Sequence, residues 1–183
     1  MTETNERSFD EQLTALIAEQ GIFVCPTINV NAPYVAELTG VVVGEHLATV
    51  RDMGVRIIAG TDAGIDNTPH HQYAGGLEYL VKLGFRAADA LAMATTEAAA
   101  ALGLGAVTGR LAPGYDADLI VVHGDPLTDI TAIGRLQRVI ARGRDYVPDS
   151  GRFDVSTPGT PFASPDNTVN LDLLTRATRR RQA

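Results

Sequence analysis

Apolar residues in this chain are grouped in two distinct ways. Two runs are short, continuous and rich in β-branched residues, which predicts strands buried on both faces: Ile22–Ile28 and Val55–Gly60. In other stretches, apolar residues recur every three or four positions and a glycine often follows the last of them, which predicts helices. These helical stretches cover residues 8–20, 35–53 (in pieces), 73–83 and 87–102.

The order helix, strand, helix, strand, helix is typical of a parallel sheet with helical crossovers, so the predicted fold class is α/β. In such sheets, ligands bind beyond the carboxyl ends of the strands. Asp62 comes directly after the second predicted strand, between Thr61 and a tight turn at Gly64. We therefore expect its carboxylate to face a ligand site. The alternative is a turn-forming acid, since Asp is common in turns.

The pattern changes after Gly105. Residues 117–122 and 136–141 predict two more strands, and a Pro-Gly pair at 113–114 predicts a turn before them, so this part is expected to be a small β unit. From Pro148 onward the chain is rich in Pro, Ser, Thr, Asp and Gly, which is typical of a loosely ordered tail. The predicted divisions are therefore 1–103, 104–147 and 148–183.

Composition narrows the possible classes of protein. The 183 residues are 45% hydrophobic, which suffices for a core, and the net charge of −7 argues against a general nucleic-acid binder. The single cysteine, Cys25, excludes an internal disulfide framework, and its apolar neighbours predict that it is buried. No apolar run is long enough to span a membrane, and Met1–Arg7 is polar, so a cytoplasmic protein is expected.

Three segments, in this order, resemble the C-terminal part of the amidohydrolase superfamily, in its imidazolonepropionase-like and Xaa-Pro dipeptidase-like branch: GVRIIAGTDAG, GLEYLVKLGFRAADALAMATTEAAAALGL and TGRLAPGYDADLIVVHGDPLTDITAIGRLQRVIARGR. The resemblance implies a metal-dependent hydrolase of carbon–nitrogen bonds in cyclic amides or dipeptides. Its fold would be a (β/α)8 barrel with a small β-sandwich, of which this chain would hold about two barrel strands with their helices and part of the sandwich. Asp62 matches the aspartate that follows the last barrel strand, where it ligates a divalent metal, most often zinc, and shuttles the proton.

The resemblance also implies ligands that this sequence lacks. The family has a His-x-His pair on the first strand, often a lysine on the fourth, and single histidines on the fifth and sixth. The four histidines form no such pair: His46, His70, His71 and His123. Lys82, the only lysine, lies in a predicted helix. A catalytic zinc usually takes three protein ligands, and the resemblance supplies only Asp62. In the family, the sixth-strand histidine comes shortly before a segment like MTETNERSFDEQLTALIAEQGI, so the resemblance implies that Met1 lies just past the last missing ligand.

His70 and His71 follow Asp62 in the same loop and are candidates for substrate contact or, alternatively, solvated loop residues. Three functions remain open. The chain is a hydrolase of a small-molecule substrate, completed by an N-terminal barrel piece; or an inactive remnant; or an assembly module that uses the open sheet edge at Ile22–Ile28, as in a homo-oligomer. A preceding reading frame with His-x-His would favour the first, and a defined oligomer the third.

Overall fold

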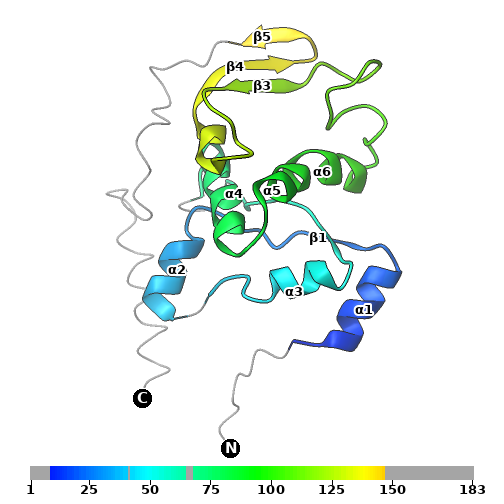
Figure 1. The fold of residues 1–183 in the computed structure, drawn as a ribbon, viewed down its shortest axis with the longest axis vertical. Helices are drawn as coiled ribbons and strands as arrows, with labels where there is room; N and C mark the ends of the chain where they lie inside the picture. The colour runs from blue at the N-terminus through cyan, green and yellow to red at the C-terminus, as the bar shows by residue number, and fades with distance from the viewer. Residues whose placement is uncertain (1–8, 41, 65–67, 147–183) are drawn as a thin grey trace, which may run out of the picture.

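We describe the fold from a computed structural model, which defines residues 9–40, 42–64 and 68–146. Three layers follow one another in Figure 1: a small sheet at one end, helices α4, α5 and α6 in the middle, and β1 with α1, α2 and α3 at the other end. The elements, in chain order, are α1 (Glu11–Glu19), β1 (Phe23–Val24), α2 (Ala32–Thr39), α3 (Leu47–Asp52), β2 (Arg56–Ile57), the 3₁₀ turn η1 (His70–Gln72), α4 (Tyr73–Lys82), α5 (Ala87–Ala94), α6 (Thr96–Ala101), β3 (Leu119–Val122), the 3₁₀ turn η2 (Ile130–Gly134), β4 (Leu136–Ala141) and β5 (Arg144–Tyr146).

The first two strands pair in parallel, as the sequence predicts. Phe23 lies opposite Arg56 and Val24 opposite Ile57. The regular pairing is shorter than the apolar runs, because Pro26 cannot donate a backbone hydrogen bond and Thr27 takes a left-handed conformation with φ 50°. The segments that follow β1 and β2 therefore leave the sheet in the same direction, at the carboxyl ends of the two strands.

The predicted β unit is a three-stranded antiparallel sheet in the order β3-β4-β5, with an irregularity between Val121 and Val122. The sequence indicates β3 and β4; β5 adds a short hairpin strand after the turn at Arg142 and Gly143. Whether this sheet is part of a sandwich, and whether residue 103 ends a domain, stay predictions. The tail 148–183 lies outside the described residues.

The prediction of one helix over 87–102 is wrong, because the segment divides into α5 and α6 at Thr95. Thr95 leaves the helical conformation, with φ −129° and ψ −88°. A methyl group placed on Gly109 would stand 2.9 Å from the Thr95 carbonyl oxygen, so the loop before β3 lies against this break. Adjacent β-branched residues, Thr95 and Thr96, also weaken helical continuity.

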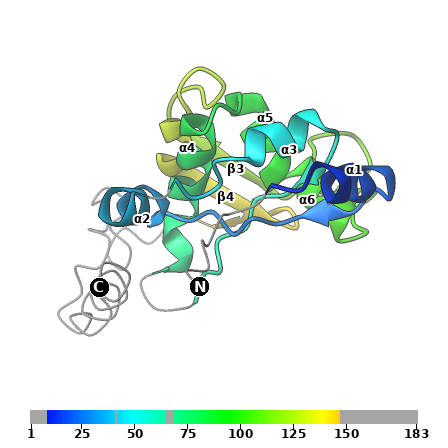
Figure 2. The same cartoon turned by 90° about the horizontal axis from the view of Figure 1, so that it is seen from below.

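One hydrophobic cluster joins the layer that contains β1 to the middle helices and to η2. It includes Ile28 and Ile57 from the two strand segments, Leu77 and Leu80 from α4, and Ile130 from η2. Figures 1 and 2 both show α1 and α2 at opposite ends of the layer that contains β1 and α3. Within the described residues, no helix is long and apolar enough to cross a membrane.

The prediction that Cys25 is buried is wrong, because its side chain is exposed. Cys25 follows β1 at the sheet edge, and its Sγ lies against Gly60, where an added methyl group would stand only 2.4 Å away. The apolar run around Cys25 is a local property of the sequence, whereas its exposure depends on how few elements cover this edge.

Candidate active site

Asp62 lies beyond the carboxyl ends of the two parallel strands, β1 and β2. After β1 the chain passes through Thr27 (φ 50°), and after β2 it passes through Asp62 (φ 54°). Residues other than glycine rarely adopt this left-handed region, although Asp and Asn tolerate it better than most. Asp62 is exposed, whereas its neighbour Thr61 is only 8% exposed. The fold therefore anchors the backbone before Asp62 and leaves the carboxylate open to solvent.

Two asparagines that follow β1 bind the loop that carries Asp62. The Asn29 side-chain amide donates a hydrogen bond to the Thr61 carbonyl oxygen at 3.3 Å. The Asn31 side-chain amide donates to Thr68 Oγ1 at 3.4 Å, and the Asn31 backbone N–H donates to Asn29 Oδ1 at 2.9 Å. The sequence analysis missed these residues. Their position just after a strand that runs parallel to the Asp62 strand was the available signal.

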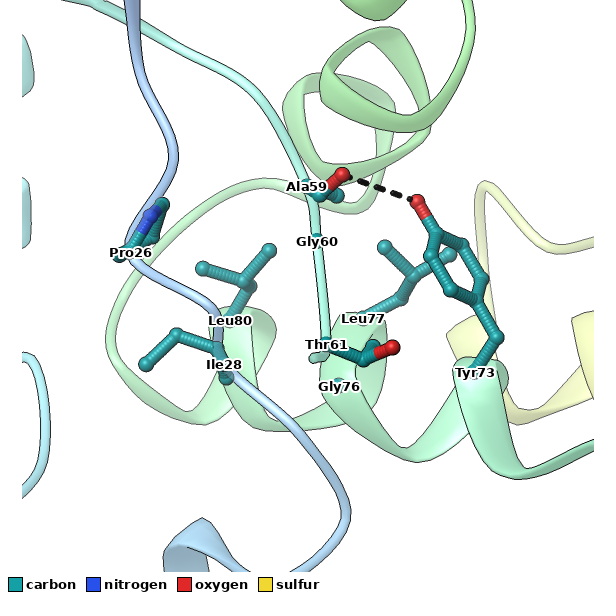
Figure 3. Close-up of a pocket in the computed structure, with 9 residues that line it drawn as sticks. All are labelled: Pro26, Ile28, Ala59, Gly60, Thr61, Tyr73, Gly76, Leu77 and Leu80. Carbon is teal, nitrogen blue, oxygen red and sulfur yellow. Dashed lines mark hydrogen bonds between the residues drawn. The ribbon is translucent and has the colours of Figure 1, made fainter. Parts of the chain in front are cut away.

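A small pocket, shown in Figure 3, lies between α4 and the segments that follow β1 and β2. Its lining comes from both strand exits and from α4: Pro26, Ile28, Ala59, Gly60, Thr61, Tyr73, Gly76, Leu77 and Leu80. The interior leaves no space for a water molecule. The pocket is therefore filled by side chains and cannot hold a substrate. A substrate would have to bind outside it, on the solvent side of the loop that carries Asp62.

Gly76 allows this close packing of α4 on the strand exits. A methyl group placed on it would stand 2.5 Å from the Ile28 carbonyl oxygen and 3.5 Å from Thr61 Cγ2. A larger residue would therefore push the helix away from both strand exits. Gly76 therefore allows Thr61, and with it Asp62, to take its observed position next to α4.

Tyr73 fixes the other side of the Asp62 strand. Its hydroxyl donates a hydrogen bond to the Ala59 carbonyl oxygen at 3.4 Å, as Figure 3 shows. Burial raises the pKa of the Tyr73 phenol, and the electrostatic effect of the nearby Cys25 raises it further. Because the hydroxyl therefore keeps its proton at neutral pH, it remains a hydrogen-bond donor.

His70 and His71 form the 3₁₀ turn before α4, and both are exposed. The His70 ring lies near the Asp62 loop, since a methyl group placed on Gly64 would stand 3.5 Å from His70 Nε2. A role in substrate contact stays a prediction for both histidines.

The other two histidines contact different parts of the fold. His46 stacks on Phe9 with ring centroids 5.2 Å apart. The backbone N–H of His123 donates a hydrogen bond to the Arg135 carbonyl oxygen at 2.8 Å.

The donor atoms near Asp62 do not make up a complete metal site. Across the described ranges 9–40, 42–64 and 68–146, no group of three or more His, Cys, Asp or Glu side chains could hold a metal ion. A catalytic zinc takes three protein ligands, and Asp62 would supply one. The described residues therefore do not fit a zinc ion by themselves.

Comparisons with known proteins show what this arrangement resembles. The sequence profile described as the amidohydrolase family matches residues 5–145. A Xaa-Pro dipeptidase solved with bound methionine is 28% identical with a TM-score of 0.68, and the match covers 76% of this chain and 38% of that one. A putative prolidase from Bifidobacterium longum is 30% identical with a TM-score of 0.63, over 93% of this chain and 44% of that one.

An ochratoxinase from A. niger is 26% identical with a TM-score of 0.64, and the match covers 76% of this chain and 35% of that one. No curated protein sequence matches the chain. The chain thus spans less than half the length of these solved relatives.

Proposed function

Because the chain belongs to the amidohydrolase family, we propose that it carries the catalytic carboxylate of a hydrolase that cleaves carbon–nitrogen bonds in cyclic amides or dipeptides. The position of Asp62 is the observation that carries this proposal. The residue follows a strand of a parallel pair, and its carboxylate is exposed at the edge where α/β folds bind ligands. The similarity to a Xaa-Pro dipeptidase and a putative prolidase supports dipeptides as the substrate class.

In the proposed reaction, Asp62 is the general base and then the general acid. A water molecule attacks the carbonyl carbon of the scissile amide, and the Asp62 carboxylate takes a proton from that water. When the carbon–nitrogen bond breaks, the protonated carboxyl gives the same proton to the leaving nitrogen. The products are a carboxylic acid and an amine, and Asp62 returns to its ionised form.

The family resemblance implies a divalent metal, most often zinc, and assigns Asp62 as one ligand, but the described residues contain no group of three or more possible ligands. We therefore propose that the remaining ligands come from an N-terminal barrel piece, either in a preceding segment or in a separate chain. The exposed Asp62 carboxylate is accessible to such a partner.

Reconstitution tests this proposal. The chain would be co-expressed with an N-terminal piece of a related prolidase that ends at its sixth-strand histidine. We expect a complex that binds zinc and hydrolyses an Xaa-Pro dipeptide. Asp62→Asn should keep the assembly, because Asn also tolerates the left-handed backbone, but it should abolish turnover, because an amide cannot take the proton. A fully active Asp62→Asn complex, or the absence of any complex, would contradict the proposal.

The chain by itself should show no zinc-dependent turnover, because a single carboxylate binds zinc weakly. Dialysis against zinc followed by metal analysis, together with an assay of dipeptide hydrolysis, checks this. One zinc per chain, with hydrolysis that Asp62→Ala removes, would mean that the chain alone forms a complete site.

A second candidate function is assembly through the open sheet edge. In the described part of the chain, β1 and β2 pair only with each other, so each has one edge that is not paired with another strand. Ile22, directly before β1, is an exposed apolar residue, as are Leu13 and Leu16 in α1. Uncovered edges favour pairing with other chains. A defined oligomer by sedimentation would support this function, whereas a monomer or a heterogeneous aggregate would not.

A further inference from the structure

The loop that carries Asp62 is held at both ends by one short segment after β1. Asn29 binds the Thr61 carbonyl oxygen at the start of the loop, and Asn31 binds the Thr68 hydroxyl at its end. The hydrogen bond from the Asn31 N–H to Asn29 Oδ1, at 2.9 Å, links the two asparagines. We call Asn29 and Asn31 the asparagine pair.

Burial makes these contacts more consequential than similar contacts on the surface. Asn31, Thr61 and Thr68 are 7%, 8% and 4% exposed. Water replaces a lost hydrogen bond poorly at such positions, so a partner left without one is costly. The loop is also closed by its own backbone, because the Gly64 N–H donates to the Thr68 carbonyl oxygen at 2.9 Å.

The Asn29 contact acts on the peptide group that sets the conformation of Asp62. The Thr61 carbonyl belongs to the same planar unit as the Asp62 N–H, so its direction depends on φ of Asp62. That angle is +54°, in a region that non-glycine residues rarely adopt. A donor fixed on the Thr61 oxygen favours this orientation over the ordinary one, in which the oxygen would point elsewhere.

We propose that Asn29 is a positioning residue for Asp62: its hydrogen bond to the Thr61 carbonyl holds the left-handed backbone that presents the Asp62 carboxylate at the sheet edge. Asn31 holds the far end of the same loop through Thr68. The inference rests on the proposed function only in giving Asp62 a catalytic role. The backbone effect is a property of this chain and can be measured without any activity.

The experiment uses Asn29→Asp in the full chain. The substituted carboxylate has nearly the same shape and still accepts from the Asn31 N–H, but it cannot donate to the Thr61 oxygen. NMR would record the Thr61 carbonyl ¹³C shift, which responds to hydrogen bonding. It would also record the three-bond coupling between the amide and α protons of Asp62, which depends on φ. Asn31→Asp is the matched control, because it introduces the same charge beside the loop and leaves the Asn29 amide and the Thr61 carbonyl oxygen unaltered.

We expect Asn29→Asp to shift the Thr61 carbonyl resonance upfield and to change the Asp62 coupling, while Asn31→Asp leaves the Asp62 coupling at its wild-type value. An unchanged Asp62 coupling in Asn29→Asp would overturn the proposal, even if the variant unfolds at a lower temperature, because stability alone would then be affected.

If Asn29→Asp does not fold, hydrogen exchange of the Asn29 side-chain amide in the unaltered chain tests whether this amide is hydrogen-bonded to the Thr61 carbonyl oxygen. Slower exchange than at the exposed Gln20 carboxamide supports the contact, and equal exchange overturns it. In the reconstituted complex, Asn29→Asp should lower kcat more than it changes KM. An unaltered complex without turnover would refute the proposed function, but the NMR result would still decide the role of Asn29.

Discussion

Replacing Gly76 with alanine should destabilise the protein, although alanine is the better helix former. The added methyl group would stand 2.5 Å from the Ile28 carbonyl oxygen, well inside normal contact distance, and 3.4 Å from the Ile28 carbonyl carbon. Both are backbone atoms that cannot move by a side-chain rotation. Helix α4 must therefore shift away from the exit of β1.

Two opposing effects set the magnitude. Alanine in a helix gains roughly 0.5–1 kcal/mol over glycine, and forcing an extra methyl group into a packed site costs roughly 1–3 kcal/mol. Because both close atoms belong to the backbone, we expect a cost in the upper part of its range, about 2–3 kcal/mol, and hence a net loss of about 1–2 kcal/mol in the free energy of unfolding. In a chain of this length that loss lowers Tm by about 2–8 °C.

Urea and thermal unfolding of Gly76→Ala, beside Gly75→Ala, test this reasoning. A methyl group on Gly75 would meet mainly a side chain, at 2.9 Å from Val30 Cγ2 and 3.0 Å from Val30 Cβ. Val30→Ala should therefore rescue part of the loss in Gly75→Ala but none of it in Gly76→Ala. If Gly76→Ala were as stable as the unaltered chain, or if Val30→Ala rescued it, the backbone contact that we invoke would not limit this site.

Three further predictions concern other contacts. Gly60→Ala should lower Tm and Cys25→Ala should restore most of the loss, because the new methyl group would stand 2.4 Å from Cys25 Sγ; a double-mutant cycle checks this coupling. Arg56→Ala should cost about 1 kcal/mol in urea unfolding, because Arg56 lies 4.0 Å above the Phe23 ring and pairs with Glu97; an unchanged midpoint would refute it. Hydrogen bonds from Thr131 and then Arg135 lower the pKa of Asp129 to about 2, so its stabilising effect should be complete above about pH 4 and be lost as the pH falls towards 2. Asp129→Asn should remove that part of the pH dependence, as measured by unfolding at a series of pH values.

The sequence by itself determined most of the elements and the place of the candidate catalytic residue along the chain. The spacing of apolar residues is a local property, and it predicted the segments that contain β1, β2, β3 and β4. The alternation of helices and strands along the chain then predicted that β1 and β2 pair in parallel. Asp62 was located because an acid directly after a buried strand of a parallel sheet lies at the ligand-binding edge.

Only the tertiary structure decided how Asp62 is held. Its left-handed φ, the contact between Asn29 and Thr61 across 32 positions, and the approach of Gly76 to Ile28 all depend on how the crossover helices pack against the strands. The exposure of Cys25 depends on the same packing. A hydrophobic pattern records whether a residue favours burial, but not which distant backbone atom it will face. That choice is made by steric fit between elements, which local patterns do not encode.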